Sequence, residues 1–190
     1  MKAVLISIKP KWCELIASGK KTVEVRKTRP KLETPFKCYI YRTLPKYGDW
    51  NDKDGKVIGE FVCEKITYLG NVATDPWKYL LGDIHEENKR LITDEACLSE
   101  KEILQYKGRY AWHISDLVIY DKPQELSELI PNCQYGQDGE CTGASEFYCP
   151  FQKRDYNPDG SINLVECGKK ITRPPQSWCY VEELKGENHV

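Results

Sequence analysis

The chain has 190 residues, of which 40% are hydrophobic and 11% aromatic, so it can build a core and is not expected to be disordered. Its formal net charge of −1 argues against a uniformly basic nucleic-acid binder. Residues 1–46 nevertheless hold twelve Lys and Arg against three Glu, either gathered on one surface or scattered around a small barrel.

The first segment, "MKAVLISIKPKW", briefly resembles a signal peptide. Its apolar run ends at Lys9 and no small-residue cleavage site follows, so we predict a strand over 4–8 and a cytoplasmic protein. The longest apolar stretches hold only a few residues, too few for a transmembrane helix. Pro10 is typical of the first position of a helix, and Gly19 is typical of its end.

A short charged strand is predicted over 22–26. Period-two alternation places Thr22, Glu24 and Arg26 on one face, and Val23 and Val25 on the other. A carboxylate between cations has three interpretations: an ion pair with a neighbouring cation, recognition of a base edge, or catalysis.

Further strands are predicted over 37–42, 56–69 and 109–120, with a turn over 51–56 and a bend or bulge at Gly59. Asp75 and Pro76 indicate the start of one helix, and Ser99 with Glu102 forms a capping box. A loop or short helical exit follows over 122–129. The predicted fold class is α+β, a small and mostly antiparallel barrel-like sheet with two or three short helices.

From residue 131 the chain is poor in aliphatic residues and rich in Gly, Asp, Gln and Cys. We predict a domain over 1–130, an extension over 131–184 and a flexible tail over 185–190. A structural Zn²⁺ ion is expected to hold the extension, although free or transiently oxidised thiols and an iron–sulfur cluster are alternatives. The expected ligands are Cys133, Cys141, Cys149 and Cys167, with Cys179 as the alternative fourth ligand. The other four cysteines have apolar neighbours and are predicted to lie in the core.

Several motifs together resemble the ASCH domain family of the PUA-like superfamily. They are "LISIKPKWCELIASGKKTVEVRK", "KCYIYRTLPK", "GKVIGEFVCEKI" and "RYAWHISDLVIYDKPQELSEL", which span roughly residues 2–130. The closing "RPPQSWCYVEEL" is similar to the C-terminal extension of a bacterial and phage subgroup. The resemblance implies a β-barrel with packed helices, a cleft beside the Lys-Thr strand, and binding of RNA or modified nucleobases.

We therefore predict a basic cleft that binds RNA or a nucleobase-containing ligand without turnover. Cations would hold phosphates, flat side chains would stack on bases, and polar groups would read base edges. Trp12 is predicted to lie in the core rather than to stack. The candidate binding residues are Lys9, Lys11, Lys20, Lys21, Thr22, Glu24, Arg26 and Tyr41.

The resemblance also implies an enzymatic alternative. Some small ASCH proteins are amidohydrolases that remove the acetyl group of N4-acetylcytidine with a Lys, a Thr and a later Glu. The Lys matches Lys21 and the later Glu corresponds to Glu95, but Glu24 occupies the position of the nucleophilic Thr. That exchange removes the acyl-enzyme route and leaves Glu24 as a general base for water. A protein-interaction or phage-accessory module is a further alternative.

Overall fold

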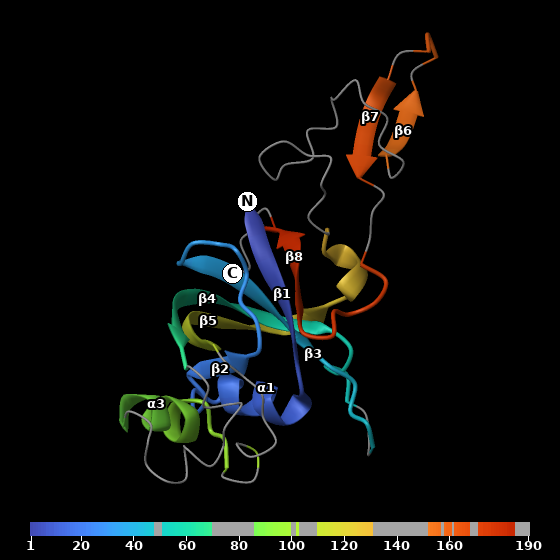
Figure 1. The fold of residues 1–190 in the computed structure, drawn as a ribbon. Coiled ribbons are helices and arrows are strands. Elements are labelled where there is room, and N and C mark those ends of the chain that lie inside the picture. Colours follow the sequence, from blue (N-terminus) through green and yellow to red (C-terminus); the bar gives the residue numbers. More distant parts are fainter. Residues whose placement is uncertain are drawn as a thin grey trace.

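The computed structural model describes residues 1–47, 51–69, 86–99, 102, 110–130, 152–156, 158–160, 162–167 and 171–184. Six strands form a mixed sheet in the order β2-β5-β4-β3-β1-β8, curled into a half-barrel (Figure 1). Their bounds are β1 Lys2–Ile8, β2 Val23–Arg26, β3 Phe36–Arg42, β4 Val57–Tyr68, β5 Tyr110–Gln124 and β8 Trp178–Glu182.

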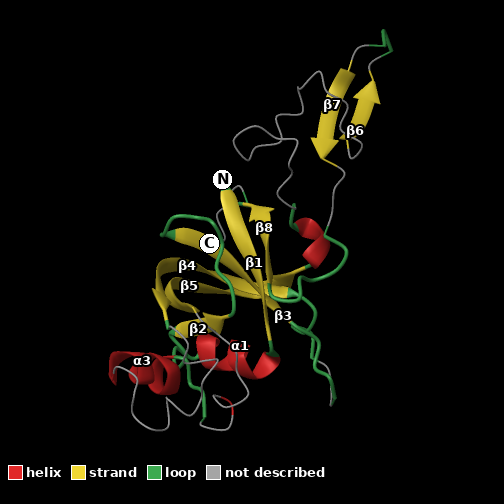
Figure 2. Cartoon of the chain, viewed as in Figure 1, coloured by secondary structure: helices red, strands yellow, loops and turns green. Residues whose placement is uncertain are grey.

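The sheet is mostly antiparallel. Only the β1–β3 pair is parallel among the strand pairs that the described residues form. A second sheet consists of the hairpin β6 Gln152–Tyr156 and β7 Ile162–Cys167, drawn apart from the half-barrel in Figure 2. The predicted α+β class and small PUA-like barrel are confirmed.

Helices α1 and α3 lie at one end of the half-barrel (Figure 2). Helix α1, Pro10–Ala17, begins at the expected proline, and Gly19 follows it with φ of 71°, a left-handed conformation that favours glycine. Helix α3, Glu86–Arg90, runs into the π-helical turn η2, Leu91–Glu95, and the 3-10 turn η3 covers Leu126–Glu128. None of the helices in the described part is long and apolar enough to cross a membrane.

The helix expected after Asp75 lies outside the described residues. The predicted capping box is confirmed by its hydrogen bonds. The Ser99 backbone N–H donates to Glu102 Oε2 at 3.0 Å, and the Glu102 backbone N–H donates to Ser99 Oγ at 3.4 Å. These bonds satisfy two backbone donors that a helix start leaves unpaired.

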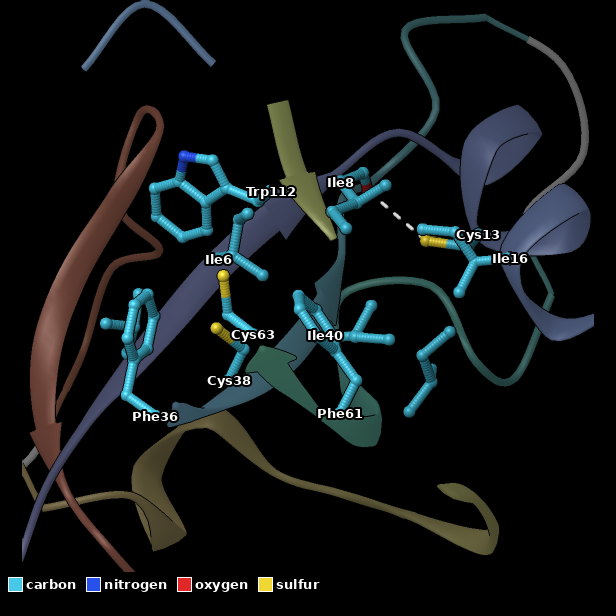
Figure 3. Packing of buried hydrophobic residues seen from close by; sticks show 12 residues of the cluster. Ile6, Ile8, Cys13, Ile16, Phe36, Cys38, Ile40, Phe61, Cys63 and Trp112 are labelled. Carbon is cyan, nitrogen blue, oxygen red and sulfur yellow. Dashed lines mark hydrogen bonds between the residues drawn. The ribbon is translucent and has the colours of Figure 1, made fainter. Parts of the chain in front are cut away.

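The main core lies between the sheet and α1. Alternate residues of β1 and β3, among them Ile6, Ile8 and Ile40, pack against Phe61 and Trp112 (Figure 3). Cys13, Cys38 and Cys63 are buried there as predicted, whereas Cys97, also predicted to lie in the core, is only half-buried. Burial raises the pKa of the Cys13 and Cys63 thiols to about 12. The three buried cysteines are therefore neutral core residues at physiological pH.

Strand β8 adds the C-terminal part of the chain to the sheet. It pairs antiparallel with β1, and Val181 opposite Ala3 is fully buried. The predicted domain boundary at residue 131 stays a prediction. The β1–β8 ladder nevertheless joins strands from the two ends of the described chain in one sheet.

Candidate ligand-binding pocket

Three charged side chains from the motif at the start of β2 meet in the interior. Lys21 Nζ lies 3.3 Å from Glu24 Oε2, and Arg26 Nε lies 3.1 Å from Glu24 Oε1. Lys21 is 3% exposed and Glu24 is 5% exposed. The ion-pair interpretation of Glu24 is therefore what the structure shows, with both neighbouring cations taking part.

Local geometry explains why these side chains converge. The left-handed Gly19 turns the chain back after α1, and the Lys21 N–H donates to Leu15 O at 3.0 Å. In β2, Val23 and Val25 pack into a hydrophobic cluster with Leu69 and Leu91. The strand alternation then directs Glu24 and Arg26 to the opposite face.

The two cations are held by further contacts. Lys21 Nζ donates to Ala96 O at 2.7 Å, in the turn that follows η2. The Arg26 guanidinium donates to Ser7 O at 2.5 Å and reaches Ser177 Oγ at 3.5 Å. These contacts join β2 to the turn after η2, to the end of β1 and to the residue that precedes β8.

Glu24 and Arg26 face a pocket of about 730 Å³. The pocket lies where the end of β1, the start of α1 and the segment before β8 meet. Its lining residues are Ser7, Ile8, Lys9, Lys11, Trp12, Glu24, Arg26, Thr43, Leu98, Glu102, Pro174, Pro175 and Gln176. A pocket with one buried carboxylate, several cations and an aromatic wall can bind a flat polar ligand.

Trp12 forms a wall of this pocket. It was predicted to lie in the core, but the structure leaves it half-buried, packed against two hydrophobic clusters and also lining the pocket. The ammonium groups of Lys11 and Lys21 lie 4.4 Å and 4.9 Å from its ring centroid. These two cation–π contacts hold the ring in place where it lines the pocket.

The Lys11–Glu102 ion pair forms another part of the lining. The nitrogen–oxygen distance is 2.7 Å. The Lys11 ammonium and the Ser99 hydroxyl donate hydrogen bonds to Glu102, which lowers the pKa of its carboxyl to about 2. Glu102 is therefore ionised at physiological pH and offsets the charge of Lys11, whereas Lys9 has no ion-pair partner among the described residues.

Glu24 keeps hydrogen-bonding capacity although it is buried. Arg26 Nε lies within ion-pair distance of it but is not aligned for a hydrogen bond. Lys21 directs its hydrogen bond to Ala96 O. Among the described residues, no donor makes an aligned hydrogen bond to either oxygen of Glu24. Both oxygens are held by ion pairs, and the carboxylate lines the pocket, where it can accept hydrogen bonds from a ligand.

The remaining predicted residues lie around or away from the pocket. Lys20 and Thr22 are exposed beside β2 and are not part of its lining. Tyr41 is 4% exposed and packs in a separate cluster with Leu5, on the opposite face of β3 from Ile40. Glu95 pairs with Arg90 at 3.8 Å, and its backbone O accepts from the Thr22 N–H at 3.0 Å.

Some lining residues were missed by sequence reasoning. Ser7 was predicted only as part of a strand, and Glu102 only as part of a capping box. Pro174, Pro175 and Gln176 lie about 150 residues after the Lys21 motif in the sequence, so no local pattern connects the two segments. The Pro-Pro pair before an apolar strand was the available signal, because it marks a rigid turn leading into the sheet.

The zinc site stays a prediction. Cys133, Cys141 and Cys149 lie outside the described residues, as does the side chain of Cys167. Cys179 is a free, half-buried cysteine whose pKa is raised by burial. No group of metal-ligating side chains occurs within the described part of the chain.

Comparison with known proteins identifies the family of this chain. A model of the ASCH domain matches residues 6–124, which is most of the chain. The chain therefore belongs to the ASCH domain family. No curated protein matches it significantly.

Similar solved structures include ASCH from Zymomonas mobilis, with 26% identity, a TM-score of 0.44, and coverage of 65% of this chain and 73% of that one. Two single-residue variants of the same protein have 28% identity and a TM-score of 0.45. They cover 66% and 65% of this chain, and 77% and 74% of their own.

Proposed function

We propose that the pocket binds a nucleobase, carried by RNA or by a nucleoside, without chemical turnover. The observation that supports this most directly is Glu24, which is buried, faces the pocket and receives no aligned hydrogen bond from the described residues. A ligand that offers N–H groups can donate hydrogen bonds to this carboxylate. Amino groups of bases are such donors.

The surrounding residues fit the other parts of a nucleotide. Trp12 offers an aromatic face on which a base can stack, an interaction worth about 1–3 kcal/mol per base. Lys9 has no ion-pair partner in the described part of the chain and is available for a phosphate. A phosphate alone would be repelled by Glu24, so the pocket favours a ligand with both a base and an anionic or polar group.

The contacts of Lys21 support binding over hydrolysis. Its ammonium is surrounded by Glu24, Ala96 O and the Trp12 ring, and it does not line the pocket. Its clearest role is to hold Glu24 in place. The position that carries a nucleophilic threonine in the hydrolases holds Glu24 here, so an acyl-enzyme cannot form at this position.

The binding test uses short homopolymeric single-stranded RNAs of each base, followed by fluorescence anisotropy, together with titration of the free nucleosides. We expect the wild-type protein to bind at least one RNA. Trp12→Leu should weaken binding about 5- to 150-fold through loss of stacking. Lys9→Ala should weaken it and reduce its salt dependence, because one phosphate contact is lost.

The matched control is Lys37→Ala, since Lys37 is a cation of β3 that pairs with Glu60 at 2.9 Å and does not line the pocket. This variant should bind like the wild type. Absence of binding by the wild type, or equal binding by the Trp12 and Lys9 variants, overturns the proposal and favours a protein-interaction role. Chromatography after incubation with N4-acetylcytidine tests the alternative function, which is hydrolysis of an acylated nucleoside. Release of cytidine and acetate that stops in Lys21→Ala would establish hydrolysis.

A further inference from the structure

One wall of the pocket comes from the segment 174–177, which lies outside the residues that match the ASCH domain model. Pro174, Pro175 and Gln176 line the pocket. The family match ends at residue 124. Part of the pocket surface is therefore supplied by a segment that is separate from the shared domain, where a specificity element can differ without altering the domain itself.

This wall is anchored on both sides of Gln176. The Ser7 hydroxyl donates to Pro175 O at 2.6 Å, and the Ser7 backbone N–H donates to Ser177 O at 2.9 Å. Arg26 reaches Ser177 Oγ at 3.5 Å. Because the proline rings also restrict the backbone, the position of Gln176 is fixed before any ligand arrives.

The Gln176 side chain itself is available. It is exposed, and no described residue makes a hydrogen bond to its amide. The amide carries two N–H donors and one carbonyl acceptor, so it can match a base edge that presents a donor beside an acceptor. Glu24 can only accept while it is ionised, so Gln176 supplies the donors that Glu24 lacks.

We propose that Gln176 is the specificity-determining residue of this pocket and reads the acceptor groups of the bound nucleobase, while Glu24 accepts from its amino group. This inference rests on the proposed function. It identifies the preferred ligand as a base with an amino donor next to a ring acceptor, as in cytosine and adenine. Uracil presents no amino group to Glu24 and is expected to bind more weakly.

The test measures the affinities of oligocytidine, oligoadenine and oligouridine for the wild type and for Gln176→Ala. The wild type should prefer the amino-bearing bases over uracil. Gln176→Ala should reduce that preference about tenfold, because a ligand acceptor then loses its partner. The thermal midpoint should stay unchanged, since the side chain is exposed and makes no hydrogen bond to a described residue.

Thr172→Ala is the matched control, an exposed residue of the same segment that does not line the pocket. It should keep both affinity and base preference. If the wild type binds RNA and Gln176→Ala keeps the same preference, the inference about Gln176 is wrong while the proposed function stands. If the wild type binds no RNA and no nucleoside, both are wrong.

Discussion

Glu24 is the central anion of a buried group of three charged side chains. Its carboxylate lies between Lys21 and Arg26, and side-chain exposure is 7% for Glu24 and 2% for Lys21. Removing such charges from water is costly, and the cost is offset only while all partners are present. A group of this kind contributes little net stability as a whole, yet loss of its central anion leaves two cations facing each other.

Glu24→Gln should therefore lower the free energy of unfolding by about 3–5 kcal/mol, because the glutamine keeps the shape but leaves Lys21 and Arg26 uncompensated. Urea denaturation followed by circular dichroism measures this change. Arg90→Ala serves as the control, since the Arg90–Glu95 pair has a separation of 3.8 Å and Arg90 is 75% exposed. Its effect should stay below about 1 kcal/mol. Equal effects of the two variants would contradict the argument that Lys21 and Arg26 depend on the charge of Glu24.

At the scale of elements, the β4–β5 pair departs from regular register near Gly59. The pairing shifts between Val57 and Gly59, and a β-carbon placed on Gly59 would lie 2.4 Å from the backbone oxygen of Val118. The bend therefore depends on a residue without a side chain. The sequence indicated a bend or bulge at this position, and the structure confirms it.

Gly59→Ala should destabilise the fold by about 3 kcal/mol, since the backbone of β5 must move to accept the added methyl group. Thermal unfolding measures the effect. Gly19→Asn is the comparison, because Gly19 has a positive φ but nothing within 4 Å of an added β-carbon. Asparagine tolerates that conformation, so its cost should be below about 1 kcal/mol. A smaller effect at Gly59 than at Gly19 would refute the argument that a methyl group at Gly59 clashes with the backbone of β5.

For the whole molecule, the decisive feature is how the half-barrel is completed. Among the strands that the structure describes, β2 and β8 are the two edges of the sheet and form no ladder with each other. Side chains cross this opening instead: Arg26 reaches Ser7 O and Ser177 Oγ, and Trp178 Nε1 donates to Thr28 Oγ1 at 3.1 Å. The pocket lies at this seam, so its shape depends on β8 staying paired with β1.

Val181→Asp tests that dependence. Val181 is fully buried on β8 in a cluster with Leu5 and Leu129, and an ionised carboxylate there has no partner. We expect a loss of about 3–5 kcal/mol of stability, measured by chemical denaturation. Arg173→Ala, an exposed change in the same segment, should have almost no effect. A variant at Val181 as stable as the wild type would show that β8 is dispensable for the fold.

Most elements of the half-barrel could be predicted from the sequence, because local preferences of the chain determine them. Apolar runs and period-two patterns identified five of its six strands, all except β8. Pro10 and Gly19 bounded α1, and Ser99 with Glu102 marked a capping box. Each of these signals lies within a few residues of chain, where steric and hydrogen-bonding preferences act directly. The charged motif at β2 was recognised for the same reason, and an ion pair was one of the roles considered for Glu24.

Tertiary structure alone decided what surrounds that motif. Trp12 lines the pocket and Tyr41 lies in the core. The curvature of the sheet determines which face of each element is covered, and a local sequence pattern does not determine that curvature. Ser7 and Ser177 contact Arg26 because the β1–β8 ladder brings the two ends of the described chain together. Such long-range pairings follow from the packing of the whole sheet, because the free energy that fixes them is spread over many buried residues.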